Sequence, residues 1–101
     1  FLYISGQIAI NPETQKIEET TVEGQTKQVL ENLTAILENN GLTTSNVVKT
    51  MILLDSIEDF KTVNEIYAGY FSAPYPARSA FEVGKLPLGA LVEIEAIAYL
   101  K

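Results

Sequence analysis

Hydrophobic residues recur at intervals of three or four over residues 21–39, and polar residues fill most of the positions between them. This spacing lines one side of a helix with apolar side chains. Thr20 followed by Glu23 resembles a capping box at the helix start, and Gly41 is part of a C-terminal stop signal. The pattern therefore predicts an amphipathic helix over residues 21–39. Its apolar stripe is Val22, Val29, Leu30, Leu33, Ile36 and Leu37.

The same spacing returns further along the chain and predicts a second amphipathic helix, from Ser56 to about Phe71. Ser56 with Asp59 repeats the capping-box pattern at its start. Pro74 and Pro76 follow the segment and exclude a longer helix, because proline cannot continue the helical hydrogen bonding. The apolar stripe of this helix is Phe60, Val63, Tyr67, Tyr70 and Phe71.

Segments rich in β-branched and aromatic residues predict four strands. The first contains Gly6, which marks a bulge or a place where another group approaches the backbone closely. The turn signal Asn11-Pro12 ends that strand, and residues 12–19 are polar enough to predict a surface loop. Residues 86–89 supply a further turn. The predicted strands are residues 1–10, 47–54, 77–83 and 91–99.

The predicted elements follow the order strand, helix, strand, helix, strand, strand. This alternation favours an α/β (α+β) sandwich, in which a mixed β-sheet carries two helices packed on one face. The strands are apolar on both faces, so we expect a partner on the uncovered face. The length of 101 residues fits a single domain. Because the chain opens with a strand-like segment and no Met, we also expect that an N-terminal segment preceding this strand is missing from it.

The amino-acid composition argues against several classes of function. The formal net charge is −6 and the seven basic residues are scattered, so no basic stripe is available to bind nucleic acid. Histidine and cysteine are both absent, which argues against a zinc site and excludes imidazole or thiol catalysis. No apolar run reaches the length of a membrane span. These features favour a cytoplasmic protein that binds small ligands without a metal, nucleic-acid or membrane partner.

The chain has one arginine, Arg78, at the start of a predicted strand. A planar guanidinium holds a carboxylate through two parallel hydrogen bonds, so Arg78 is a candidate for binding an acidic ligand. A structural ion pair with Glu82, Glu93 or Glu95, or simply an exposed charge, is an equally good interpretation of the sequence.

Five other residues, in three segments, carry candidate chemistry. Glu93 and Glu95 alternate with apolar residues, so both project from one face of a strand. A carboxylate there could act as a general base, but the pattern alone favours a solvated outer face. Asn64 falls within the apolar stripe of the second helix, where its amide contacts a ligand or ties down a loop. Around Ser5 and Gly6 the backbone either exposes N–H groups to an anion or forms a bulge.

Five segments, spread over nearly the whole chain, carry a recognisable pattern: residues 4–8, 25–33, 63–67, 76–80 and 91–98. Taken together they resemble the RidA family. The resemblance implies a chorismate-mutase-like fold assembled as a homotrimer, with ligand sites between the subunits. It also implies an activity, the cofactor-free hydrolysis of reactive enamines and imines to 2-oxo acids and ammonia. The substrates it implies are 2-aminoacrylate/2-iminopropanoate and 2-iminobutanoate.

The same resemblance implies roles for individual residues. Arg78 would clamp the substrate carboxylate, and Glu93 rather than Glu95 would orient the hydrolytic water. Ser5, Gly6, Asn64 and Ala80 would contact the substrate, with Ala80 using its backbone. Two alternatives remain: a non-enzymatic regulatory trimer that binds small carboxylic acids, and a ribonuclease or translation inhibitor. The acidic charge and the missing histidine disfavour the second alternative.

Overall fold

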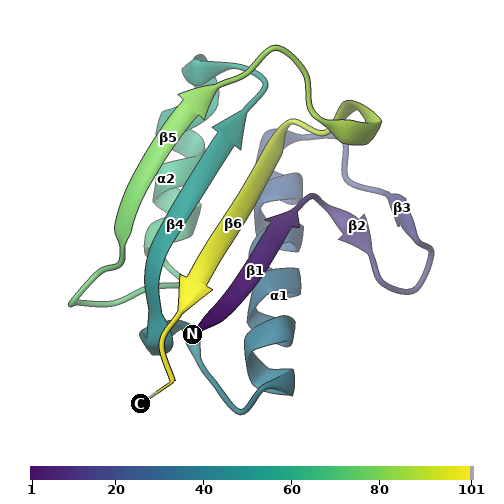
Figure 1. Cartoon of the computed structure of the whole chain (residues 1–101). Helices are drawn as coiled ribbons and strands as arrows, with labels where there is room; N and C mark the ends of the chain where they lie inside the picture. The colour runs from purple at the N-terminus through teal and green to yellow at the C-terminus, as the bar shows by residue number, and fades with distance from the viewer. Residues whose placement is uncertain (101) are drawn as a thin grey trace.

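One four-stranded β-sheet carries both helices on a single face (Figure 1). The structure, a computed structural model, describes residues 1–100. The predicted arrangement of two helices on one face of a mixed sheet is confirmed. The strands of this sheet are β1 (Leu2–Gln7), β4 (Val47–Leu54), β5 (Ala77–Glu82) and β6 (Val92–Ala98), and the helices are α1 (Val22–Asn39) and α2 (Phe60–Ala68).

The strand order in the sheet is β1-β6-β4-β5. Strands β4 and β5 run parallel and are joined through α2, whereas β6 is antiparallel to both of its neighbours. Strand β5 is therefore an edge strand, and β6 lies in the interior of the sheet. This order puts the strand that carries Arg78 at one side of the sheet and the strand that carries Glu93 two positions away.

The predicted first strand, residues 1–10, is wrong in its extent. Strand β1 ends at Gln7, and the chain then forms a small hairpin from β2 (Ile10–Asn11) and β3 (Lys16–Ile17). Part of the predicted loop 12–19 thus pairs as a strand. The break follows the predicted bulge, because the register of β1 shifts between Ile4 and Gln7, on either side of Gly6.

The starts of the helices also differ from the sequence prediction. The cap of α1 is Thr21, not Thr20, because Oγ1 of Thr21 accepts a hydrogen bond from the backbone N–H of Gly24. The predicted capping box of Thr20 with Glu23 is therefore wrong, because the helix cap lies one residue later in the chain. The predicted stop at Gly41 is confirmed, since Gly41 has the positive φ of 72° that follows many helices.

The second helix is shorter than predicted. A 3₁₀ turn, η2 (Ile57–Asp59), comes first, and Oγ of Ser56 caps it by accepting from the N–H of Glu58. Helix α2 then ends at Ala68 instead of Phe71. Phe71 is buried all the same, with its ring stacked at 4.5 Å on that of Tyr67.

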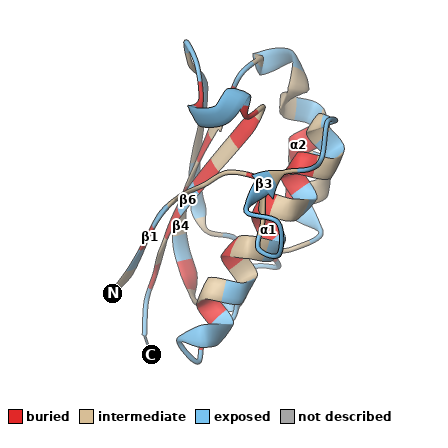
Figure 2. Cartoon of the chain, turned by 90° about the vertical axis from the view of Figure 1, so that its right-hand side faces the viewer, coloured by how far each residue is buried: buried red, intermediate tan, exposed pale blue. Residues whose placement is uncertain are grey.

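The hydrophobic core fills the space between the sheet and the helices (Figure 2). It combines the predicted stripes of both helices with the inward residues of β4 and β6. Within residues 1–100, neither helix has the length and apolar character that a membrane span requires. The largest fully buried hydrophobic side chains are Leu30, Leu33, Leu37, Ile52, Leu54, Ile94, Val29, Val63 and Val92.

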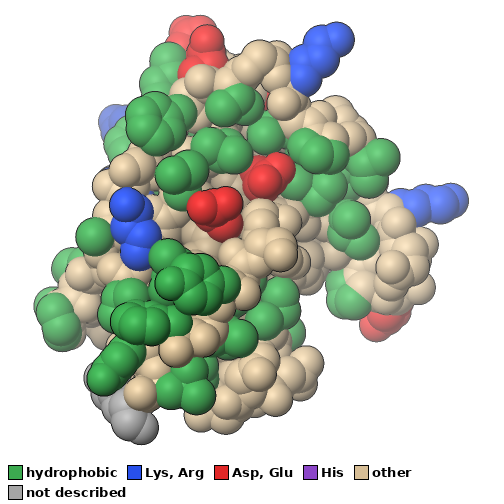
Figure 3. Space-filling view, in the orientation of Figure 1, with side chains coloured by type: hydrophobic (Ala, Val, Ile, Leu, Met, Phe, Trp, Pro, Cys, Tyr) green, Lys and Arg blue, Asp and Glu red, His purple; other side chains and the backbone are tan. Residues whose placement is uncertain are grey.

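No element of the described chain covers the other face of the sheet, and Figure 3 shows apolar side chains over much of it, with acidic groups near the centre. Tyr3 and Phe81 are 72% and 53% exposed, and the ring of Phe1 lies 5.2 Å from that of Tyr99. A large apolar area on a soluble protein commonly marks an interaction surface.

Gln25 joins the start of α1 to the start of β6 and so helps to place the strand that carries Glu93. Its buried amide donates to the carbonyl of Glu19 at 3.0 Å and accepts from the N–H of Leu91 at 2.9 Å. Leu91 is two residues before Glu93.

Replacing this amide should destabilise the fold. In Gln25→Leu both backbone groups lose their partners, so the free energy of unfolding should fall by about 1–3 kcal/mol. Lys27→Leu is the matched control, because Lys27 is exposed on the same helix. Urea unfolding of the two variants checks this, and equal stability of both would contradict the role given to Gln25.

Candidate functional site

Arg78 lies on the helix-covered face of the sheet, at its edge. In the parallel ladder of β4 and β5 it pairs with Thr50, which is fully buried toward the helices. Paired residues in a ladder point to the same face, so Arg78 extends toward α2. There its Nη1 donates a hydrogen bond to Oδ1 of Asn64. The prediction that Arg78 and Asn64 belong to the same site is consistent with this contact.

Two aromatic rings support the guanidinium. Its Cζ atom lies 5.0 Å from the ring centroid of Tyr67 and 5.3 Å from that of Phe60. Both distances are within the range of cation–π attraction. In the part of the chain that the structure describes, Arg78 does not form the ion pair that the sequence allowed. Glu93 and Glu95 lie on the opposite face of the sheet, and Glu82 instead accepts a hydrogen bond from the N–H of Ile57.

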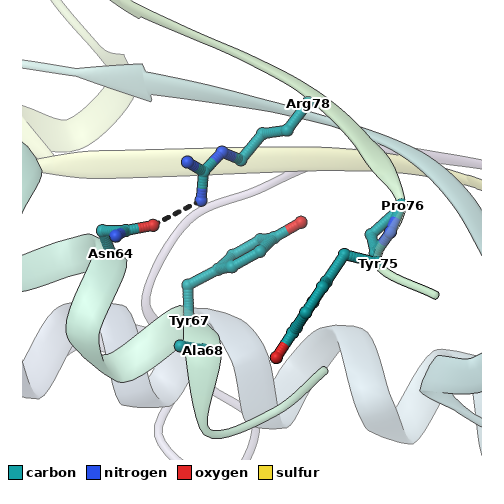
Figure 4. A pocket seen from close by; sticks show the side chains of 6 residues that line it. All are labelled: Asn64, Tyr67, Ala68, Tyr75, Pro76 and Arg78. Atoms are coloured by element: carbon teal, nitrogen blue, oxygen red, sulfur yellow. Dashed lines mark hydrogen bonds between the residues drawn. The ribbon is translucent and has the colours of Figure 1, made fainter. Parts of the chain in front are cut away.

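A cavity of about 370 Å³ opens beside Arg78 (Figure 4). Its size is in the range of small-molecule sites. It combines one permanent cation and one amide with tyrosine rings, which suits a small ligand carrying a carboxylate. The lining residues are Asn64, Tyr67, Ala68, Tyr75, Pro76 and Arg78.

Tyr67 forms the floor of this cavity and is almost completely buried. Its hydroxyl shares a hydrogen bond of 2.7 Å with Oγ1 of Thr50. Burial raises the pKa of Tyr67 above its ordinary value, while the Thr50 hydrogen bond and the charge of Arg78 act in the opposite direction. The phenol is therefore neutral at physiological pH.

Glu93 lies on the open face of the sheet, next to Gly6. A Cβ atom placed on Gly6 would overlap the Glu93 carboxylate, so the glycine leaves the room that this side chain occupies. Ser5 is exposed in the same bulge of β1. These three predicted site residues thus come together. Glu95 shares their face but is more exposed than Glu93.

The predicted site residues therefore form two groups on opposite faces of one sheet. Arg78 and Asn64 are in contact, and Ala80 follows two residues after Arg78 on the same face, where it packs against the core. Glu93 belongs to the other group, with Ser5 and Gly6. A single copy of the chain does not bring Arg78 and Glu93 to one cavity.

Sequence reasoning did not identify two features of the cavity. Phe60 and Tyr67 were predicted as members of an apolar stripe, whereas the structure places the cation of Arg78 over both rings. Their spacing of seven residues put them on one helix face with Asn64, which was the available signal. Tyr75 was given no role from the sequence, and it forms one wall of the cavity.

No metal centre emerges from the described residues: nowhere in 1–100 do three His, Cys, Asp or Glu side chains come together in a way that could hold an ion. The expectation of a cofactor-free site stays a prediction.

Comparison with known proteins gives the family. The sequence model described as Endoribonuclease L-PSP matches residues 1–100. Over 99 residues the chain is 54% identical to Reactive Intermediate Deaminase A, chloroplastic, from Arabidopsis thaliana, an alignment that covers 98% of this chain and 53% of the relative. The chain belongs to the RidA family.

Two further members of the RidA family are similar to this chain over most of its length. The human protein named 2-iminobutanoate/2-iminopropanoate deaminase is 47% identical over 97 residues, which are 96% of this chain and 71% of that protein. The crystal structure of RidA from the Antarctic bacterium Psychrobacter sp. superposes with a TM-score of 0.92 at 44% identity, over 97% of this chain and 79% of that one. The chain therefore spans about half the length of the Arabidopsis relative and most of the length of the other two.

The close approach of Gly6 and Glu93 leads to a prediction for this RidA-family site. Gly6→Ala should retain the fold and displace the Glu93 carboxylate, because the group in the way is the end of a flexible side chain. Gly84→Ala is the control, since a Cβ at Gly84 meets nothing within 4 Å.

Crystal structures and melting temperatures of both variants test this prediction. We expect a moved carboxylate in Gly6→Ala alone, with melting temperatures near that of the parent chain. An unmoved Glu93 in a folded Gly6→Ala variant would show that the glycine does not define its place.

Proposed function

We propose that this chain is a 2-iminobutanoate/2-iminopropanoate deaminase-type hydrolase. It would convert 2-aminoacrylate/2-iminopropanoate and 2-iminobutanoate into the corresponding 2-oxo acids and ammonia. The observation that carries the proposal is the contact of Arg78 with Asn64 at the edge of a cavity of suitable size. The deaminase names of the Arabidopsis and human relatives support the same reaction.

Arg78 binds the substrate carboxylate in this proposal. A guanidinium carries five N–H donors, and Asn64 uses one of its nitrogens. The remaining donors can form the parallel pair of charge-assisted hydrogen bonds that a carboxylate accepts. This contact fixes the orientation of the ligand, and with it the position of the imine carbon relative to the attacking water.

Glu93 acts as the general base. The imine carbon is electrophilic once its nitrogen is protonated, so water positioned beside it needs only a nearby proton acceptor. As the water oxygen bonds to this carbon, Glu93 takes the proton and a carbinolamine forms. The protonated Glu93 then returns its proton to the amine nitrogen. The C–N bond breaks as the carbinolamine hydroxyl loses its proton to solvent, which releases ammonia and leaves the 2-oxo acid. An enamine substrate first takes a proton at carbon to become the protonated imine.

A second copy of the chain completes the site. Because the sheet separates Arg78 from Glu93, the proposal requires the Glu93 face of one copy to lie against the Arg78 cavity of another. The uncovered apolar face supports such an assembly. We propose a chorismate-mutase-like homotrimer with three equivalent sites, in which Ser5 and Gly6 accompany Glu93, and Asn64 and the backbone of Ala80 accompany Arg78.

Coupling the chain to a pyridoxal-phosphate-dependent threonine dehydratase tests the activity. The rate at which 2-oxobutanoate appears should exceed the spontaneous rate of imine hydrolysis. If the added chain leaves that rate unchanged, the deaminase proposal is wrong, and the non-enzymatic carboxylate-binding trimer becomes the better interpretation.

Arg78 variants test carboxylate binding in the same assay. Arg78→Ala should abolish the acceleration, and Arg78→Lys should recover only part of it, because an ammonium keeps the charge and loses the forked geometry. Lys85→Ala is the control, an exposed cation beyond the end of β5. Normal turnover in Arg78→Ala would remove the role given to this residue.

Glu93 variants test the base. Glu93→Gln should lower kcat by about 10²–10⁴-fold, the usual contribution of a positioned general base, while ligand binding is retained. Glu95→Gln is a closely matched control on the same strand and face. Equal losses in the two variants would argue against a specific role for Glu93.

A further inference from the structure

Arg78 extends from an edge strand and is exposed, yet its guanidinium contacts three side chains of α2, those of Phe60, Asn64 and Tyr67. A free arginine side chain would lose roughly 2 kcal/mol of rotamer entropy on ordering. Any contact that orders the guanidinium before the ligand arrives removes part of that loss from the binding step. The groups that order Arg78 therefore influence ligand affinity even where they touch no ligand.

We propose that Tyr67, held by its hydrogen bond to Thr50, is a positioning residue that presets the guanidinium of Arg78 for carboxylate binding. This inference rests on the proposed function for its ligand, because it assigns to Arg78 the substrate carboxylate. It adds two residues, Tyr67 and Thr50, whose effect would pass entirely through Arg78.

The first step of the argument is the anchoring of the Tyr67 ring. Thr50 is 0% exposed and Tyr67 is 4% exposed, and their hydroxyls are 2.7 Å apart. The ring also stacks on Phe71, with centroids 4.5 Å apart. A hydroxyl bound at one end and a stacked neighbour leave the ring little freedom to tilt. Tyr67 is thus a fixed platform on α2, and Thr50 connects it to the sheet.

The second step is the position of Arg78 relative to that platform. Thr50 is the residue directly beside Arg78 in the parallel ladder of β4 and β5. The same threonine therefore sets the ring of Tyr67 and adjoins the backbone of the arginine. Cζ of Arg78 lies 5.0 Å from the Tyr67 centroid, and Asn64, one turn earlier on α2, binds Nη1 (Figure 4). The Tyr67 ring and the Asn64 amide thus contact the guanidinium from the same helix.

The third step concerns charge. An aromatic face and an amide oxygen attract a guanidinium without neutralising it. A carboxylate in the same place would compete directly with the carboxylate of a ligand. Burial raises the pKa of Tyr67, which keeps this phenol neutral and preserves the arrangement at physiological pH. Arg78 is therefore held in place with its full charge available to the cavity.

Three variants separate the parts of this support. Tyr67→Leu removes the aromatic face, Thr50→Val removes the anchoring hydroxyl at nearly constant volume, and Thr50→Ser restores that hydroxyl. Thr26→Val is the matched control, because Thr26 is also 0% exposed and its hydroxyl binds a backbone carbonyl within α1. The control loses a buried threonine hydroxyl without touching the Tyr67 platform.

The decisive readout needs no ligand. Arg78 is the only arginine in the chain, so ¹⁵N-arginine labelling gives a single Nε–Hε signal without further assignment. Relaxation measurements should show a markedly lower order parameter for this group in Tyr67→Leu and Thr50→Val than in the parent chain. Thr50→Ser and Thr26→Val should keep the parent value. An unchanged order parameter in a folded Tyr67→Leu variant would overturn the inference, whatever the activity of the chain.

Ligand affinity gives the second readout. Titration with 2-oxobutanoate, the product of the proposed reaction, should show Kd raised about 2- to 5-fold in Tyr67→Leu, the scale of one cation–π contact at an exposed arginine. Thr50→Val should raise Kd by a smaller factor and Thr50→Ser should restore it. In the coupled assay KM should rise while kcat changes little, because carboxylate binding is shared by ground and transition states.

These readouts distinguish the inference from the proposed function. If Arg78 loses order in Tyr67→Leu while the parent chain shows no turnover, the positioning role is supported and the deaminase proposal is contradicted. Turnover that requires Arg78, with the order parameter, Kd and KM unchanged in Tyr67→Leu, supports the deaminase and contradicts the positioning role.

Discussion

The alternation of side chains along a β-strand is the constraint on which this site depends. Successive residues of a strand point to opposite faces of the sheet, and this places Arg78 against α2 and Glu93 on the open side. Each group has its own local support: Asn64 and two aromatic rings for the cation, and the side-chain-free Gly6 for the carboxylate. Neither can reach the other through the sheet. The fold therefore presents two half-sites, and the proposed chemistry requires that two copies of the chain meet.

The half-site around Arg78 shows how a small protein keeps a cation available for a ligand. Its neighbours are an amide oxygen and aromatic faces, which orient a guanidinium and leave its charge uncompensated. The nearest glutamate of the same strand, Glu82, is occupied by the N–H of Ile57. The hydrogen bond between Thr50 and Tyr67 extends this support into the core, so that packing between α2 and the sheet bears directly on where the Tyr67 ring lies beside Arg78.

Periodicity was enough to predict both helices, the four strands of the main sheet and the single face on which the helices pack. It failed where the signal is short or ambiguous. Two-residue strands such as β2 and β3 carry no period, and the cap of α1 is Thr21, one residue after the predicted Thr20. The face of the sheet on which Arg78 lies could not be predicted, because each face of β5 carries both polar and apolar residues. The resemblance to the RidA family indicated both Arg78 and Glu93 as site residues. Only the strand register shows that they lie on opposite faces of the sheet.

Mixing two inactive variants tests the central claim of a site shared between copies. Arg78→Ala and Glu93→Gln chains are unfolded, combined in equal amounts and refolded together, and each variant is refolded alone as a control. If one copy supplies Arg78 and another supplies Glu93, random assembly leaves about a quarter of the sites with both residues intact, so about a quarter of the parent activity should return. If both residues act within one copy, every site in the mixture retains one defect. Activity no higher than that of the separate variants, in an assembled mixture, would contradict the account.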